Sequence, residues 1–197
     1  MRLMLQVRDD DAGAFEELVH RYQTRLVSLM THLVGRRDMA EDLAQDVFLR
    51  IYRARKRYLP GSKFSTWMYT IARNVASNAL RGLARRREVN LVGRDSGETA
   101  GNPLEAAAVD ASGLMPTRLL DKAELSEVVR SAIEALSERQ RMAVLLNKFE
   151  HLSYEEIAEV MQLTPSAVKS LLSRARSNLR DVLDPYLQQG TKIEEIE

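Results

Sequence analysis

The sequence predicts an all-α protein in which two small helical domains are joined by a flexible linker. Apolar residues recur at helical spacing along most of the chain, and no segment alternates apolar and polar residues for long enough to form a strand. Residues 88–123 break this pattern, because glycine, proline and acidic residues gather there. A chain of 197 residues has room for two domains on either side of such a linker.

The N-terminal domain, residues 12–87, is expected to be a bundle of amphipathic helices. The helices run from about 14 to 34, from about 39 to 57 and from 64 to about 87. The turn-forming run 59–62, which contains a proline and a glycine, ends the second helix. Each helix has one apolar stripe, and that of the second helix comprises Leu43, Val47, Phe48, Ile51 and Tyr52.

The C-terminal domain, residues 124–187, is expected to contain a helix-turn-helix, and residues 188–197 form a tail. The runs at 137–140 and 153–156 have the form of capping boxes that open helices. After a turn, Thr164 is the expected N-cap of the last helix and Pro165 its first residue. Helices over 153–161 and 164–183 joined in this way are typical of a helix-turn-helix. Two packed helices of an ordinary bundle are the alternative.

The net charge of +1 conceals two basic stretches. Residues 47–87 contain eleven lysine and arginine side chains and no acid, and residues 165–180 contain four bases and no acid. A solvated surface usually mixes both signs, so these stretches indicate surfaces that bind a polyanion. Chance clustering on solvated helix faces is the alternative.

The last helix is expected to present small hydroxyl and basic side chains on its outward face. Small hydroxyl residues let a helix lie deep in the major groove of duplex DNA, and lysine and arginine reach guanine edges or phosphates. The sequence therefore predicts a DNA-binding protein. The candidate contact residues on this helix are Ser166, Lys169, Ser170, Ser173 and Arg174.

Other function classes find no support in the sequence. The chain has no cysteine, so disulfides and thiolate metal sites are excluded. It has neither a signal peptide at its start nor an apolar run of about 18 residues, so we expect a cytoplasmic protein without membrane insertion. The three histidines lack metal-ligand spacing, and no catalytic motif is present. We expect no enzymatic activity, no metal and no cofactor.

Four runs of the sequence resemble bacterial extracytoplasmic-function (ECF) sigma factors, which are sigma-E-like subunits of RNA polymerase. AEDLAQDVFL at 40–49 and FSTWMYTIARN at 64–74 resemble regions 2.2 to 2.4 of that family. LSYEEIA at 152–158 and VKSLLSRAR at 168–176 are similar to its region 4.2. The resemblance covers residues 12–183, with the runs in the family's order. It implies that 12–87 is sigma region 2 and 124–187 is sigma region 4.

The resemblance implies an alternative sigma factor that binds core RNA polymerase and directs promoter recognition, DNA melting and transcription initiation. The positions that match the family's contacts with the clamp helices of the largest polymerase subunit are Asp42, Gln45, Asp46 and Phe48. Without the resemblance, the two aspartates would be read as a solvated face. Phe48 is either a core residue or a partly exposed anchor of that contact.

The resemblance also assigns contacts with the promoter. Asn74 matches the position that lines a pocket for an unpaired base of the −10 element, where an amide can both donate to and accept from a base edge. Phe64 and Trp67 either stack on bases or belong to the core, and their stripe position favours the core. The side chains expected to hold upstream duplex phosphates are Arg81, Arg85, Arg86 and Arg87.

Some properties do not carry over from the family. Leu171 and Ser173 stand where some members have larger basic or aromatic residues, so the −35 sequence is not implied. The acidic linker resembles the family's segment that passes through the polymerase cleft. An anti-sigma factor is a further partner that the family implies. Two other hypotheses stay open: a free-standing DNA-binding regulator and a helical adaptor that binds only proteins.

Overall fold

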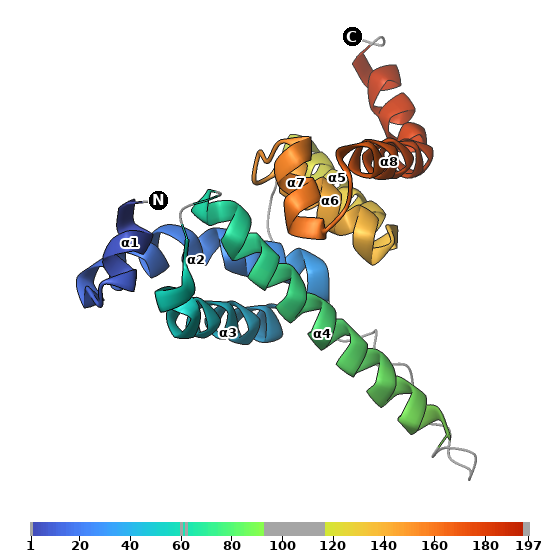
Figure 1. Ribbon diagram of the computed structural model, residues 1–197. Coiled ribbons are helices and arrows are strands. Elements are labelled where there is room, and N and C mark those ends of the chain that lie inside the picture. Colours follow the sequence, from blue (N-terminus) through green and yellow to red (C-terminus); the bar gives the residue numbers. More distant parts are fainter. Residues whose placement is uncertain (1, 60, 62, 93–116, 195–197) are drawn as a thin grey trace.

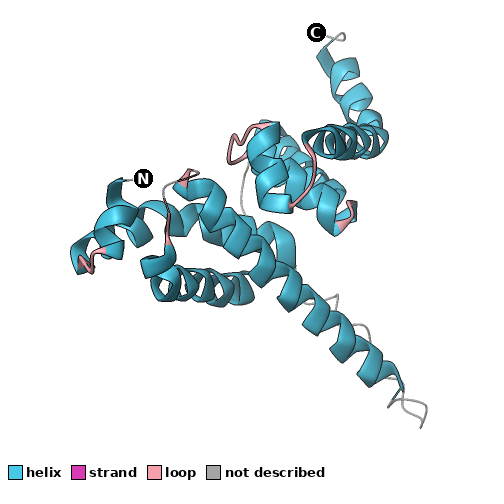
Figure 2. Ribbon diagram, viewed as in Figure 1, coloured by secondary structure: helices cyan, strands magenta, loops and turns pink. Residues whose placement is uncertain are grey.

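The computed structural model describes residues 2–59, 61, 63–92 and 117–194, and every regular element among them is helical. The all-α prediction is therefore confirmed (Figures 1 and 2). The elements are α1 Arg2–Arg8, α2 Ala12–Val34, α3 Arg37–Ala54, the 3-10 helix η1 Arg55–Arg57, α4 Phe64–Val92, α5 Thr117–Ala135, α6 Glu138–Lys148, α7 Tyr154–Met161 and α8 Pro165–Glu194. None of the helices described combines the length and apolar character that crossing a membrane requires.

We call α1–α4 the N-terminal module. Its core lies between α2, α3 and α4, where Leu26, Met30, Val47 and Met68 are fully buried. Helix α2 begins because Asp11 caps it, accepting a hydrogen bond from the Ala14 amide at 3.0 Å. It ends at a glycine in the left-handed conformation, with φ of 74°, which only glycine adopts without strain.

Helix α1 was not predicted from the sequence. It is seven residues long, and it packs on α2 and η1 by burying Met4 and Val7. Asp10 fixes the segment that follows it, since its carboxylate binds both Arg55 and Lys56. These contacts lower the pKa of Asp10 below its ordinary value, mainly through the hydrogen bond from Lys56.

The described helices also differ from the predicted ranges at their ends. Helix α3 stops at Ala54 and continues as a 3-10 turn, whereas a helix to about 57 was expected. Helix α4 runs to Val92 and α5 starts at Thr117, so both ends of the predicted linker are helical; its remainder, 93–116, lies outside the described residues. Helix α8 continues to Glu194 and includes much of the predicted tail.

We call α5–α8 the C-terminal module. Both predicted capping boxes are present, at Ser137 with Gln140 and at Ser153 with Glu156. The turn after α7 is made by Gln162, whose φ of 56° reverses the chain direction. Thr164 then caps α8 by accepting a hydrogen bond from the Ala167 amide at 3.2 Å. Local hydrogen bonds therefore define where α7 ends and where α8 begins.

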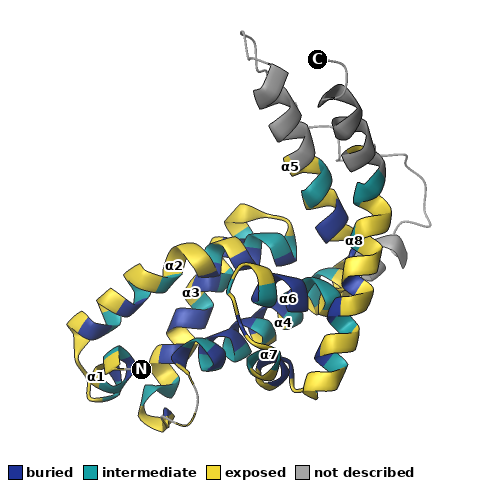
Figure 3. Ribbon diagram, turned by 90° about the horizontal axis from the view of Figure 1, so that it is seen from above, coloured by how far each residue is buried: buried dark blue, intermediate teal, exposed yellow. Residues whose placement is uncertain are grey.

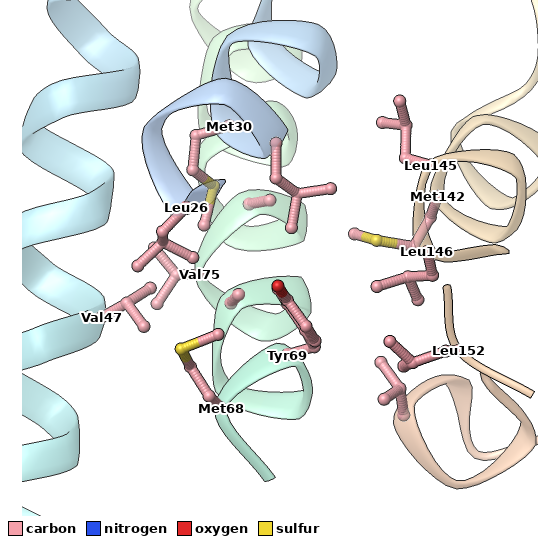
Figure 4. Close-up of a cluster of buried hydrophobic side chains, with 14 of the residues drawn as sticks. Leu26, Met30, Val47, Met68, Tyr69, Val75, Met142, Leu145, Leu146 and Leu152 are labelled. Carbon is pink, nitrogen blue, oxygen red and sulfur yellow. The ribbon is translucent and has the colours of Figure 1, made fainter. Parts of the chain in front are cut away.

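The two modules pack directly against each other. Helix α4 contacts α7, and one continuous set of buried apolar side chains includes residues of both modules (Figure 4). The Tyr69 hydroxyl donates a hydrogen bond to the Glu150 carboxylate, and Lys63 Nζ lies 2.8 Å from Glu156 Oε1. Tyr69 is only 1% exposed, and this burial raises the pKa of its phenol above the ordinary value.

We expect Tyr69→Phe to lower the free energy of unfolding by about 1–2 kcal/mol, because Glu150 loses a partner in a partly buried position. Tyr58→Phe is the matched control, since the buried Tyr58 hydroxyl has no hydrogen-bond partner and its loss should be neutral or stabilising. Urea denaturation followed by circular dichroism measures both. Equal destabilisation by the two variants would contradict this role for the Tyr69–Glu150 contact.

Candidate nucleic-acid interface

Helix α8 presents all its predicted contact residues to solvent. Its apolar side chains Val168, Leu172 and Ala175 are buried against the rest of the C-terminal module, which fixes the opposite face outward (Figure 3). None of the ion pairs among the described residues involves Lys169 or Arg174, so both charges are available to a polyanion. The exposed side chains on this face are Ser166, Lys169, Ser170, Ser173 and Arg174.

Arg176 is a residue of this helix that the sequence analysis did not assign. Its guanidinium donates a hydrogen bond to the Tyr154 hydroxyl at 3.0 Å, which joins α8 to α7. Arg176 therefore links α8 to α7 as well as adding positive charge to α8. Its place in the basic stretch was visible in the sequence, whereas its partner 22 residues away in the chain was not.

Asn74 lies on the exposed side of α4 and lines a cavity of about 640 Å³ between the modules. Arg73 Nη2 donates to Asn74 Oδ1 at 2.9 Å and to Gln162 Oε1 at 3.5 Å. The first bond orients the Asn74 amide, so that its NH₂ group is the part left free to donate. Arg73 and Gln162 are site residues that the sequence analysis did not assign.

The remaining basic side chains of α4 follow Asn74 along the helix. Arg81 and, further on, Arg85 and Arg86 are exposed on the part of α4 that extends away from the bundle (Figure 1). Arg81 donates to Asn78 Oδ1 at 2.6 Å, which holds its side chain along the helix. Arg87 lies within α4, and its side chain is outside the described residues.

Phe64 and Trp67 belong to an aromatic cluster in the core of the N-terminal module. Phe64 is buried, and Trp67 is half-buried against Tyr58 with ring centroids 5.1 Å apart. Tyr22 contacts the Phe64 ring from the other side at 5.2 Å. The core interpretation therefore holds for Phe64, and the exposed edge of Trp67 is what a ligand could reach.

On α3, Asp42 and Gln45 are exposed, and Asp46 is half-buried with an ion pair to Arg50 at 3.0 Å. Phe48 is only 6% exposed, so it packs in the core and is not a surface anchor in this conformation. Tyr52 was predicted on the apolar stripe, yet it is 41% exposed, and one side of its ring packs on Phe15 with ring centroids 5.0 Å apart.

Leu49 is an exposed apolar residue that the sequence analysis overlooked. It is 53% exposed on α3, near the acidic and amide side chains of that helix. Its exposure could have been predicted from the sequence, because Leu49 falls outside the apolar stripe of its helix. Among the described residues, no group of histidine, aspartate and glutamate side chains could hold a metal ion.

Two families match the chain. The family described as Sigma-70 region 2 matches residues 18–86, and the family described as Sigma-70, region 4 matches residues 126–179. The RNA polymerase sigma-H factor of Pseudomonas aeruginosa is 34% identical over 189 residues, which is 96% of each chain. The ECF RNA polymerase sigma-E factor of Escherichia coli K12 is 34% identical over 190 residues, which is 95% of each chain.

Solved structures match as well. CnrH, in complex with the cytosolic domain of CnrY, superimposes with a TM-score of 0.66 at 21% identity, covering 93% of this chain and 96% of CnrH. The sigma factor RpoE of Bartonella quintana, in complex with the anti-sigma factor NepR, gives a TM-score of 0.64 at 25% identity, covering 86% and 96% of the two chains. The first of these likenesses supports the fold alone.

Proposed function

The chain belongs to the extracytoplasmic-function sigma factors of the sigma-70 family, and we propose that it reads the −35 element with α8 and the −10 element with α4. It is an alternative sigma factor in transcription initiation. On this proposal it acts in the cytoplasm by binding core RNA polymerase and promoter DNA, and it catalyses no reaction itself.

The observation that carries the proposal is the outward face of α8 over residues 165–180, a stretch that contains no acidic residue. Lys169 and Arg174 are exposed there without acidic partners among the described residues, and small serine side chains surround them. A helix with small outward residues can approach base edges closely in the major groove. Its amino-terminal turn, capped by Thr164, adds a positive dipole end that favours a phosphate.

The second DNA surface is on α4. Asn74 offers a free amide NH₂ group to the acceptor edge of an unpaired base, while Arg81, Arg85 and Arg86 lie further along the same helix, where they can hold duplex phosphates. A base that leaves the stack loses stacking energy of a few kcal/mol, and a shaped polar pocket offsets that loss.

We propose that α3 supplies the polymerase contact. Asp42 and Gln45 are exposed polar groups, Asp46 adds a partly exposed carboxylate, and Leu49 adds an apolar surface beside them. Charged groups around an exposed apolar residue are typical of a protein–protein interface. The clamp helices of the largest polymerase subunit are the expected partner.

Promoter binding requires the modules to move apart. Asn74 faces a cavity whose opposite wall is the C-terminal module, and Arg73 beside it is tied to Gln162. Moving α7 away from α4 would remove that wall and open Asn74 to a base that belongs to promoter DNA. An anti-sigma factor, like NepR with the RpoE protein, is the proposed partner that would favour the packed arrangement.

We expect Lys169→Ala and Arg174→Ala each to weaken promoter binding by the polymerase holoenzyme by about 1–3 kcal/mol, because each removes a base or phosphate contact. Arg130→Ala is the control, since Arg130 is exposed on the same module but is paired with Glu127 on α5. Dissociation constants at one stated salt concentration measure the effect. Unchanged binding by the double variant would remove α8 from the promoter interface.

We expect Asn74→Ala to reduce open-complex formation more strongly than it reduces binding to closed duplex promoter. The reason is that the amide contacts a base only after that base has left the stack. Permanganate reactivity of the −10 region measures opening, and a template with that region already unpaired separates base capture from melting. A variant that matches wild type on both templates would make Asn74 a structural residue.

A further inference from the structure

The cavity between the modules is built from polar and charged side chains of both modules. It has a volume of about 640 Å³, which is in the range of small-molecule sites. Its walls come from α3, α4, α6, the end of α7 and the turn that follows, so it exists only while the modules are packed together.

Positive charge in this cavity is poorly compensated. Arg50, Arg73, Arg81 and Arg139 line it, whereas Glu138 is its only acidic residue. Arg50 is paired with Asp46, but Arg73 and Arg81 donate only to amide and carbonyl oxygens. Arg139 forms no hydrogen bond or ion pair with the described side chains.

These like charges oppose the packed arrangement to some extent, and an anion between them would relieve the repulsion. Arg73 and Arg81 belong to the N-terminal module and Arg139 to the C-terminal module. When the modules pack together, these three positive side chains therefore line the same cavity. Arg139 is also in the first turn of α6, where the helix dipole adds partial positive charge. An anion with several charged oxygens would pair with guanidinium groups from both sides.

The rest of the lining fits a flat heterocycle. Leu163 is half-buried and supplies apolar surface, and the buried Met142 and Met161 add a small area of thioether surface beside it, which suits an aromatic ring. The amides of Asn74 and Gln162 supply donors and acceptors for the edge of a base. An apolar floor with a few convergent polar groups is the usual form of a small-molecule site.

We propose that this cavity binds a nucleoside polyphosphate, with the phosphates on the arginines of both modules and the base on the methionine–leucine floor. Because the nucleotide touches both modules, it stabilises their packed arrangement. It also covers Asn74 and so opposes capture of a promoter base, a consequence that rests on the function proposed above. A nucleotide of single-stranded DNA has the same chemistry, and the experiment separates the two sources.

The test is a titration of the full chain with ATP by isothermal calorimetry, without DNA or polymerase. We expect saturable binding that Arg139→Ala weakens about tenfold, because a charge-assisted contact from the C-terminal module is lost. Arg130→Ala is the matched control and should bind ATP like wild type, since Arg130 lies outside the cavity. Both positions are exposed, and circular dichroism verifies that each variant folds.

Three further titrations identify what is recognised. Sodium triphosphate and adenosine should each bind at least about tenfold more weakly than ATP, since each fills only part of the site. The affinity for a short single-stranded oligonucleotide should be the same for wild type and for Arg139→Ala. The proposal is overturned if ATP does not bind, or if Arg139→Ala and wild type bind ATP equally. It is also overturned if triphosphate alone binds as tightly as ATP, or if the oligonucleotide requires Arg139 and binds more tightly than ATP. None of these results bears on promoter recognition by Lys169 and Arg174.

Discussion

The packing of α4, the last helix of the N-terminal module, against the C-terminal module is the interaction on which the rest of the structure depends. Met68, Ala72 and Val75 recur at helical spacing and are buried against α2 and α3. Tyr69 and Arg73, four residues apart, form a second face that contacts the C-terminal module. The packed part of α4 therefore has only a limited remaining surface for DNA, and Asn74 lies on the strip next to the second face.

This arrangement gives one surface two competing uses. The polar contacts between the modules, such as Lys63 with Glu156, are ones that water can replace at moderate cost, because Lys63 is largely exposed. The apolar part around Tyr69 is what makes the packed state stable (Figure 4). An interface of this mixed kind can hold the modules together in the free protein and still release them when a larger binding partner separates them.

Much of the fold follows from the sequence, because local patterns determine it. Capping boxes at Ser137 and Ser153, and the cap and proline that open α8, mark helix starts through contacts three residues apart. The outward face of α8 follows from the stripe opposite it. Helix α1 was missed because seven residues are too few for a clear period, and its stability comes from packing on α2.

The site between the modules could not be predicted in the same way. Arg73 and Gln162 are 89 residues apart, and no local pattern predicts that they meet. Phe48 and Tyr52 were placed on one stripe, yet Phe48 is buried and Tyr52 is 41% exposed. A stripe in the sequence indicates which side of a helix faces the core, but it does not show how far the neighbouring helices cover that side. The family resemblance indicated Asn74, but only the packed modules show that it lies in a cavity.

The most direct test of the account is the distance between the modules in the free and polymerase-bound protein. The chain has no cysteine, so single cysteines at the exposed positions Gln23 on α2 and Asn178 on α8 can carry spin labels without further changes. Pulsed electron–electron double resonance should give one short distance between the labels in the free protein and a longer distance in the complex with core polymerase and promoter DNA. An unchanged distance in a complex that starts transcription would contradict the account.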